Sequence, residues 1–291
     1  MTDTKFQRLK AVEPIICADA ILNVTFERAD VAAMLRFSED FGLIRRSEQT
    51  GGIFLRGHGR APYLVALEPS TRNQFVGMSF VAKSEADLER LAAATGAPVE
   101  PLATPGGGRR VALHDPWGLE VSVVHGIEWD TPLDCPHTEF PINTPQRKAR
   151  VNTPVRTPLR PSPLFKLGHV VLQRPDFQAA AAWYMRHLGL IPSDVQCLPD
   201  GQPALGFFRL NRGAEPADHH TLALLAARAR ISCTSPSRRS SWTPSVRAIS
   251  TCRQRVGRTS GASADTSSGA RCSTTARTPW VMNGNTVRTG M

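Results

Sequence analysis

The sequence lacks the features of a membrane-bound or disulfide-stabilised protein. No apolar run is long enough to cross a membrane, and none follows residues 1–5 at the start of the chain. The six cysteines, at positions 17, 135, 197, 233, 252 and 272, show no paired metal spacing and are too sparse for a disulfide framework. We therefore expect free thiols, no membrane contact and a cytoplasmic location.

Residues 228–291 lack lysine and histidine and contain one acidic residue, Asp265, against eleven arginines. This segment holds all of the formal charge of +10, because the first 227 residues carry 24 basic and 24 acidic side chains. It is rich in Ser, Thr, Arg, Gly and Pro and poor in large apolar residues, so it cannot fold alone. We expect a disordered basic tail behind a neutral globular body.

An arginine-rich tail is one basis for nucleic-acid binding, and such binding would weaken steeply with salt. Here the absence of lysine, and of aromatic residues other than Trp242 and Trp280, argues against a nucleic-acid partner.

The body contains two similar successions of strand and helix. In the first, strand patterns occupy residues 20–26, 52–55, 63–67, 76–81, 109–113 and 119–124, and helices are predicted at residues 30–41 and 85–94. In the second, a Gly-His-Val-Val-Leu strand at 168–172 precedes an alanine-rich helix that starts at Asp176 and is closed by Gly189 after Arg186 and His187, and strands follow near 205–210 and 221–224. Aligning Asn23 with His169 places Asp30 on Asp176, and Gly42 then falls within one residue of Gly189, which indicates an internal repeat.

Between the two repeats, eight prolines lie from Pro132 to Pro163 without hydrophobic periodicity. Proline removes backbone donors and fixes φ, so an extended linker on the surface is expected. The domain boundaries predicted from these patterns are a first domain at 1–127, a linker at 128–163, the first half of a second domain at 164–227, and the tail at 228–291.

Histidines stand out in the second repeat. His169 opens one strand, and the pair His219 and His220 precedes the later strand Thr-Leu-Ala-Leu. A lone strand histidine is usually a core or surface residue, but these motifs in this order resemble the second module of the type I extradiol ring-cleavage dioxygenases. That family belongs to the vicinal oxygen chelate (glyoxalase and bleomycin-resistance) superfamily.

The resemblance implies an α+β fold of paired βαβββ modules in two vicinal-oxygen-chelate domains, the second of which is incomplete here. It implies Fe(II), or alternatively Mn(II), held by two histidines and a carboxylate, with an aromatic diol and O₂ as substrates and a homo-oligomer as the assembly. His169 matches the first metal ligand and His220 matches the acid/base histidine, whereas His219 reads as a surface neighbour.

In both repeats, the other positions that the family uses for metal ligands hold neither a histidine nor a carboxylate. In the first repeat the three places hold Asn23, Gly77 and Ser122, which predicts a metal-free supporting domain. In the second, the remaining two places fall at residues 233–234 (Cys-Thr) and 284–285 (Gly-Asn). The resemblance therefore implies an impaired enzyme, with a metal-free protein that binds a small aromatic as the alternative.

The genetic code offers an explanation for the tail. Codons for residues 231–237, read from the third base, permit Leu-Leu-His-Val-Ala-Phe-Glu, and the Cys233–Thr234 junction can only give His or Tyr. The same shift forces Gly across Trp280 and Val281 and Glu across Met282 and Asn283, within text compatible with Asp-Pro-x-Gly-His-Glu-Trp-Glu. We infer a frameshift between about residues 226 and 231 that has displaced the last quarter of a dioxygenase.

Overall fold

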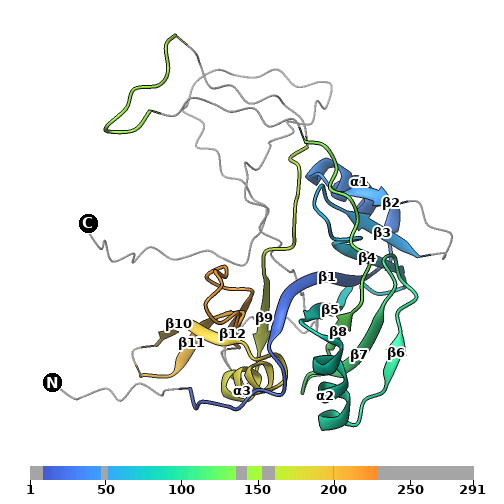
Figure 1. Ribbon diagram of the computed structural model, residues 1–291, viewed down its shortest axis with the longest axis vertical. Helices are drawn as coiled ribbons and strands as arrows, with labels where there is room; N and C mark the ends of the chain where they lie inside the picture. Colours follow the sequence, from blue (N-terminus) through green and yellow to red (C-terminus); the bar gives the residue numbers. More distant parts are fainter. Residues whose placement is uncertain (1–8, 47–51, 136–142, 153–160, 199, 228–291) are drawn as a thin grey trace, which may run out of the picture. The chain divides into compact units, whose positions relative to one another are not determined.

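The computed structural model describes residues 9–46, 52–135, 143–152, 161–198 and 200–227. The strands and helices of these residues follow two βαβββ units in the first module and one in the second (Figure 1). The α+β class and the modular order predicted from the sequence are confirmed. The tail that was expected to be disordered lies outside the described residues.

The first module is one mixed sheet of eight strands in the order β2-β3-β4-β1-β5-β8-β7-β6, here called sheet A. Its strands are β1 (Ala18–Arg28), β2 (Ile44–Arg46), β3 (Ile53–Arg56), β4 (Val65–Pro69), β5 (Gln74–Ala82), β6 (Val99–Pro101), β7 (Arg109–His114) and β8 (Glu120–His125). β1 pairs antiparallel with β5 at the centre, and each of these two strands also has a parallel neighbour, β4 or β8.

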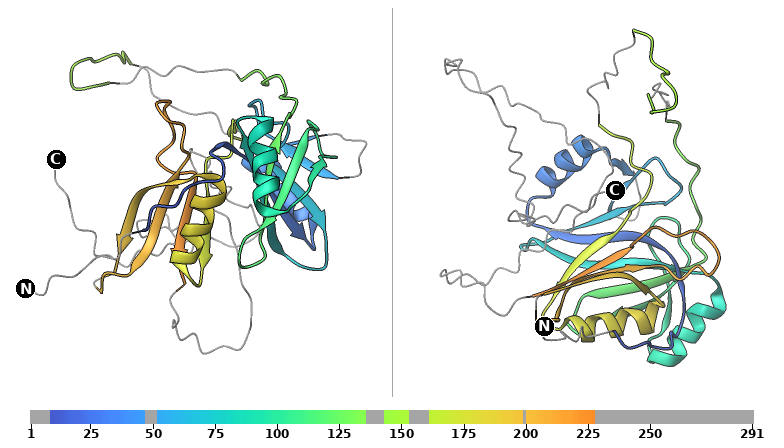
Figure 2. Two further views of the ribbon diagram at one scale, coloured as in Figure 1. Left: turned by 60° about the horizontal axis from the view of Figure 1, so that its bottom comes forward. Right: turned by 90° about the vertical axis from the view of Figure 1, so that its left-hand side faces the viewer.

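The second module forms a four-stranded sheet in the order β10-β11-β12-β9, here called sheet B. Its strands are β9 (Val170–Arg174), β10 (Ile191–Cys197), β11 (Pro203–Arg209) and β12 (Leu222–Ala226). Helix α3 (Phe177–Leu188) packs on one face of it, where a Cβ added to Gly206 would lie 2.7 Å from the Phe177 ring (Figure 2).

The helices begin and end where local chemistry dictates. α1 (Val31–Phe41), α2 (Glu85–Thr95) and α3 each begin after a residue whose side chain accepts a backbone N–H of the first turn, namely Asp30, Ser84 and Asp176. Each ends at a glycine in the left-handed region, at φ 110°, 72° and 64° for Gly42, Gly96 and Gly189. The predicted closure of α3 at Gly189, after Arg186 and His187 in the last turn, is confirmed.

The sequence patterns did not predict β2, β6 and β10, and each of these strands lies at the edge of its sheet. Edge strands bury little apolar surface, so they need not carry an apolar pattern. β10 shows this directly, since Ser193 and Asp194 are exposed and the strand contains Pro192.

A buried ion pair joins the two modules. Asp115, in the turn between β7 and β8, accepts hydrogen bonds through Oδ2 from the Arg174 guanidinium and, at 3.0 Å, from the Tyr184 hydroxyl. The Arg174 and Asp115 side chains are 4% and 0% exposed. Burial raises the pKa of Tyr184 well above its ordinary value, and the negative charge of Asp115 adds to this effect, so the phenol remains a donor.

The described part of the chain has no helix that is long and apolar enough to cross a membrane. Cys17, Cys135 and Cys197 carry free thiols, and the other three cysteines lie outside the described residues.

Replacing Asp115 by Asn tests the buried pair. The Asn amide oxygen can still accept from the Trp117 and Leu119 N–H groups. Its NH2 group, however, replaces the oxygen that accepts from Arg174 and Tyr184, so the change removes the charge and both of these hydrogen bonds. We expect the free energy of unfolding, measured by urea titration, to fall by about 3–5 kcal/mol. Tyr184→Phe should lose only about 1 kcal/mol. Equal losses for the two variants would contradict the importance of the charge pair.

His187 predicts a pH dependence of stability. Burial lowers the pKa of its imidazole, a hydrogen bond to the Trp183 carbonyl opposes this, and the Arg186 charge lowers the pKa further. Because the unfolded chain binds this proton more readily, the free energy of unfolding should fall as pH drops below about 6.5 and level off below the folded-state pKa. His187→Gln should remove this part of the dependence in urea unfolding measured at a series of pH values. An unchanged profile would show that His187 is not its source.

Candidate functional site

The parallel strand pair at the start of each repeat has the same register. Val24 to Arg28 of β1 pair with Val65 to Pro69 of β4, and Val170 to Arg174 of β9 pair with Leu222 to Ala226 of β12. The hydrogen bonds have the same phase, since Val24 N–H donates to Leu64 at 3.0 Å and Val170 N–H donates to Thr221 at 3.1 Å. These registers agree with the sequence alignment of Asn23 with His169.

The pairing of β9 with β12 brings the two predicted site histidines together. His169 directly precedes Val170, and His220 lies two residues before Leu222, the partner of Val170. Their rings lie 4.5 Å apart, centroid to centroid, with an interplanar angle of 48°. Both residues are half-buried, so each imidazole can reach solvent.

His219, the predicted surface neighbour, is exposed. Its Nδ1 nevertheless lies 3.1 Å from Nδ1 of His220, so one of these nitrogens donates to the other and the contact orients the His220 ring. His219 is thus an exposed neighbour that contacts the candidate site through His220.

Phe207 of β11 belongs to the same cluster, and the sequence analysis did not single it out. Its ring lies 4.9 Å from that of His220, edge to face, and 5.7 Å from that of His219. Phe207 pairs with Ala223, which pairs with Val171, so these three residues form one apolar row across β11, β12 and β9. The sequence signal for Phe207 was only its position in an expected strand; strand pairing placed it beside the histidines.

This arrangement offers imidazole nitrogens at the border of an apolar surface. A flat aromatic molecule with polar substituents suits such a surface, because the ring can pack on Phe207, Val171 and Ala223 while its substituents hydrogen-bond to the imidazoles.

The metal-ligand set implied by the family resemblance is not assembled by the described residues. No group of three or more His, Cys, Asp or Glu side chains that could hold a metal ion occurs among them. The places of the two remaining ligands, Cys233–Thr234 and Gly284–Asn285, lie outside the described part of the chain. His169 is therefore the one predicted metal-ligand position that the structure describes in the second module.

In the first module, the three corresponding positions lie on one face of sheet A. Asn23 pairs with Ser79 and Ser79 with Ser122, while Gly77 lies two residues from Ser79 on the same strand. Asn23 and Ser122 are 1% and 3% exposed. A Cβ added to Gly77 would lie 3.3 Å from both Cβ and the carbonyl oxygen of Glu120, so a larger side chain there requires a shift of its neighbour. These positions hold an amide, a glycine and a hydroxyl.

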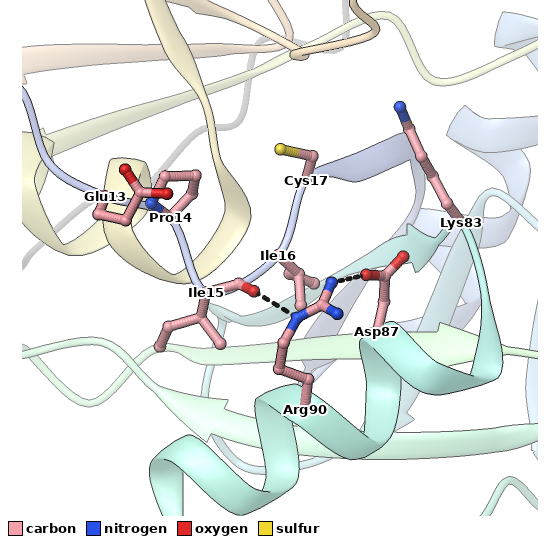
Figure 3. Close-up of a pocket in the computed structure, with 8 residues that line it drawn as sticks. All are labelled: Glu13, Pro14, Ile15, Ile16, Cys17, Lys83, Asp87 and Arg90. Carbon is pink, nitrogen blue, oxygen red and sulfur yellow. Dashed lines mark hydrogen bonds and ion pairs between the residues drawn. The ribbon is translucent and has the colours of Figure 1, made fainter.

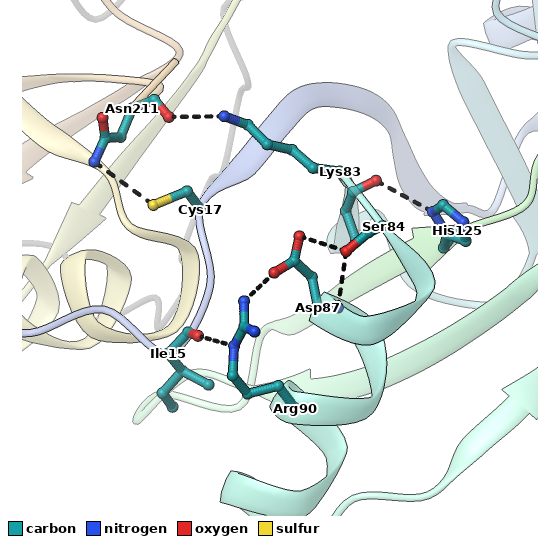
Figure 4. Close-up of polar contacts among 9 residues, drawn as sticks. Ile15, Cys17, Lys83, Ser84, Asp87, Arg90, His125 and Asn211 are labelled. Carbon is teal, nitrogen blue, oxygen red and sulfur yellow. Dashed lines mark hydrogen bonds and ion pairs between the residues drawn. The ribbon is translucent and has the colours of Figure 1, made fainter. Parts of the chain in front are cut away.

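A hollow of about 410 Å³ lies elsewhere, between the N-terminal segment and α2 (Figure 3). Three of the charged residues that line it make structural contacts. Arg90 binds Asp87 and donates to the Ile15 carbonyl at 2.9 Å. Lys83 and Cys17 each contact Asn211 of the second module at 3.5 Å (Figure 4). These contacts tie the N-terminal segment to both modules, and none of the site histidines lines the hollow.

No protein-family model matches the sequence, and no curated protein matches it either. Solved structures do match. A Mn(II)-bound glyoxalase from Novosphingobium aromaticivorans is 22% identical with a TM-score of 0.55, covering 72% of this chain and 62% of its own length. The 2,3-dioxygenase LapB of a Pseudomonas species is 16% identical with a TM-score of 0.53, and the match covers 73% and 72%.

Homoprotocatechuate 2,3-dioxygenase from Brevibacterium fuscum, in complex with 3,4-dihydroxyphenylacetate, is 18% identical with a TM-score of 0.52. This match covers 75% of the chain and 64% of the dioxygenase. The chain thus spans less than two thirds of the length of the glyoxalase and of this dioxygenase. The matches show that the chain has the vicinal-oxygen-chelate fold of the extradiol dioxygenases.

Proposed function

We propose that this chain derives from an extradiol ring-cleavage dioxygenase of aromatic catabolism and does not cleave diols as written. In this proposal His169 is the surviving metal-ligand position and His220 is the acid/base residue. The observation that carries it is the contact between the His169 and His220 rings, at 4.5 Å, in a module of dioxygenase fold. A cytoplasmic location remains a prediction from the sequence.

The surroundings of His220 support an acid/base role. Its ring contacts His169, His219 and Phe207, so its orientation is restrained from three sides. A histidine held in this way beside an apolar surface can hold a proton near a hydroxyl group of a bound diol.

The described residues do not fit a resident metal centre. Extradiol chemistry as implied by the resemblance needs two histidines and a carboxylate, and His169 supplies one of these groups. One imidazole does not retain Fe(II) or Mn(II) usefully, so the proposed state of this polypeptide is inactive.

The frameshift remains part of the proposal. Residues 228–291 contain the whole excess charge of the chain, and the displaced reading is compatible with a strand opening with His and a turn followed by Glu. Those are the two ligand types that the second module lacks. A natural basic tail would leave both coincidences unexplained.

Metal loading of the full chain tests the proposed inactivity. After anaerobic incubation with Fe(II) and removal of unbound metal, we expect far less than one iron per chain and no ring cleavage of catechol. Calorimetric titration with catechol should give the same weak binding with and without Fe(II). Near-stoichiometric iron together with cleavage would refute the proposal, whereas tight catechol binding without iron would favour the metal-free aromatic-binding protein.

Sequencing the source gene across the codons for Leu224 to Ile231 tests the frame. A missing or extra base is expected, and the chain expressed in the corrected frame should retain iron and cleave catechols. In that chain His220→Gln should lower kcat about 10²- to 10⁴-fold with iron retained, whereas His169→Ala should lose the iron. The exposed His114, replaced by Gln, serves as the control. A corrected chain without iron or activity would contradict the assignment.

A further inference from the structure

The linker between the modules contains an exposed basic turn at residues 143–152. It carries Arg147, Lys148 and Arg150 and no acidic residue. Every residue of the turn except the half-buried Ala149 is exposed, and Val151 is exposed by 79%. The turn is therefore accessible to a large partner from solution.

Hydrogen bonds among its own residues hold the turn together. The Asn143 Oδ1 atom accepts from the N–H groups of Ala149 and Arg150 at 2.9 and 3.0 Å. The Thr144 N–H donates to the Arg147 carbonyl at 2.8 Å, and the Thr144 Oγ1 atom accepts from the Arg147 N–H at 3.0 Å. Exposed local bonds of this kind open at a small free-energy cost. Their opening breaks none of the contacts between the modules that are described above.

Both ends of the linker are fixed to one residue of the first module. The Leu133 N–H donates to the His58 carbonyl at 2.8 Å, and the His58 N–H donates to the Leu164 carbonyl at 2.5 Å. The Phe165 ring lies 6.2 Å from the His58 imidazole, centroid to centroid. A break in the chain between residues 133 and 164 therefore leaves both of these ends attached to the first module.

The interface between the modules does not depend on the linker. One cluster of buried apolar side chains includes residues of both modules, for example Ile16 and Leu188. The Ile15 peptide group connects α3 to α2, because its N–H donates to the Arg186 carbonyl at 2.7 Å and its carbonyl accepts from Arg90 at 2.9 Å. Together with the buried ion pair described above, these contacts hold the modules together without a covalent connection.

Lys148 differs from the other lysines in its surroundings. The chain has lysines also at positions 5, 10, 83 and 166, and none in residues 228–291. Lys83 precedes Ser84, whose side chain caps α2, and Lys166 precedes Leu167, which is 3% exposed. Cleavage of the chain after Lys83 or Lys166 requires local unfolding of a module, whereas cleavage after Lys148 requires only the opening of the turn.

We propose that the turn at 143–152 is a processing site for an endoprotease that cleaves after Lys or Arg, and that the cleaved chain persists as a folded two-chain protein. Exposed loop tips are the preferred sites of proteolytic cleavage, and a basic side chain before the scissile bond suits a protease pocket that contains a carboxylate. This inference does not depend on the proposed enzymatic ancestry.

Cleavage of the Lys148–Ala149 bond is a hydrolysis. The C–N bond breaks, and water gives its hydroxyl group to the Lys148 carbonyl carbon and its proton to the Ala149 nitrogen. The fragments are residues 1–148 and 149–291, and each carries one partner of the buried ion pair of Asp115 and Arg174.

A lysine-specific endoprotease acting on the native full chain tests the site, because residues 228–291 contain no lysine. Beyond the first ten residues, we expect the first cut after Lys148, identified by the masses of the fragments. Lys148→Arg should block this cut with the charge retained, and Lys83→Arg is the matched control that should be cut like wild type. A first cut after Lys83 or Lys166 would overturn the proposal, as would resistance of the native chain under conditions that cleave the urea-unfolded chain.

The mass of the cleaved chain in native solution tests the two-chain state. Sedimentation velocity should give the mass of the uncut chain, and the far-ultraviolet circular dichroism spectrum should stay unchanged, while denaturing gel electrophoresis separates the fragments. Fragments that part in native solution, or a spectrum that shows loss of structure, would overturn this half of the proposal.

The hydrogen bonds of the turn should control the rate of the cut. Asn143→Ala frees the N–H groups of Ala149 and Arg150, so we expect cleavage about tenfold faster, the effect of one or two hydrogen bonds. The exposed Gln146, replaced by Ala, removes a neighbouring amide and should leave the rate near that of wild type. An unchanged rate for Asn143→Ala would contradict cleavage through opening of this turn.

Discussion

The parallel pairing of β9 with β12 is the constraint on which the candidate site depends. Its register, Val170 opposite Leu222, joins residues some fifty positions apart and sets His169 level with Thr221. A slip by one residue would turn every side chain of β9 to the other face and separate the His169 and His220 rings. The apolar row of Phe207, Ala223 and Val171 depends on the same register. The backbone hydrogen bonds between β9 and β12 thus determine which side chains of this module lie next to each other.

The buried Asp115 carboxylate has a comparable role between the modules. Its Oδ1 accepts hydrogen bonds from two backbone N–H groups of its own turn. Its Oδ2 accepts hydrogen bonds from Arg174 and Tyr184 of the second module. Arg174 ends β9, so the strand that begins after His169 is anchored at its far end to the first module. The first module, whose ligand-equivalent positions hold Asn23, Gly77 and Ser122, is thus joined through Asp115 to the end of β9.

The half-sheet and the missing ligands have a single origin if the frame of the tail is displaced. The second half of a vicinal-oxygen-chelate domain would bring both a strand beside β9 and the remaining ligand side chains. If this half has been displaced, the described residues retain one of the three ligand positions, at His169, and β9 pairs there with β12 alone.

His169 and His220 became site candidates through the family resemblance of their motifs. The sequence by itself determined the α+β class, the repeat, and the caps Asp30 and Asp176 with the closing glycines Gly42 and Gly189. These follow from local chemistry and from spacing, which need no knowledge of distant contacts. Only the tertiary structure decided the edge strands β2, β6 and β10, the place of Phe207 beside His220, and the Asp115 to Arg174 pair. Edge strands lack a strong apolar pattern, and a contact between residues far apart along the chain depends on strand register and module packing, which no local pattern encodes.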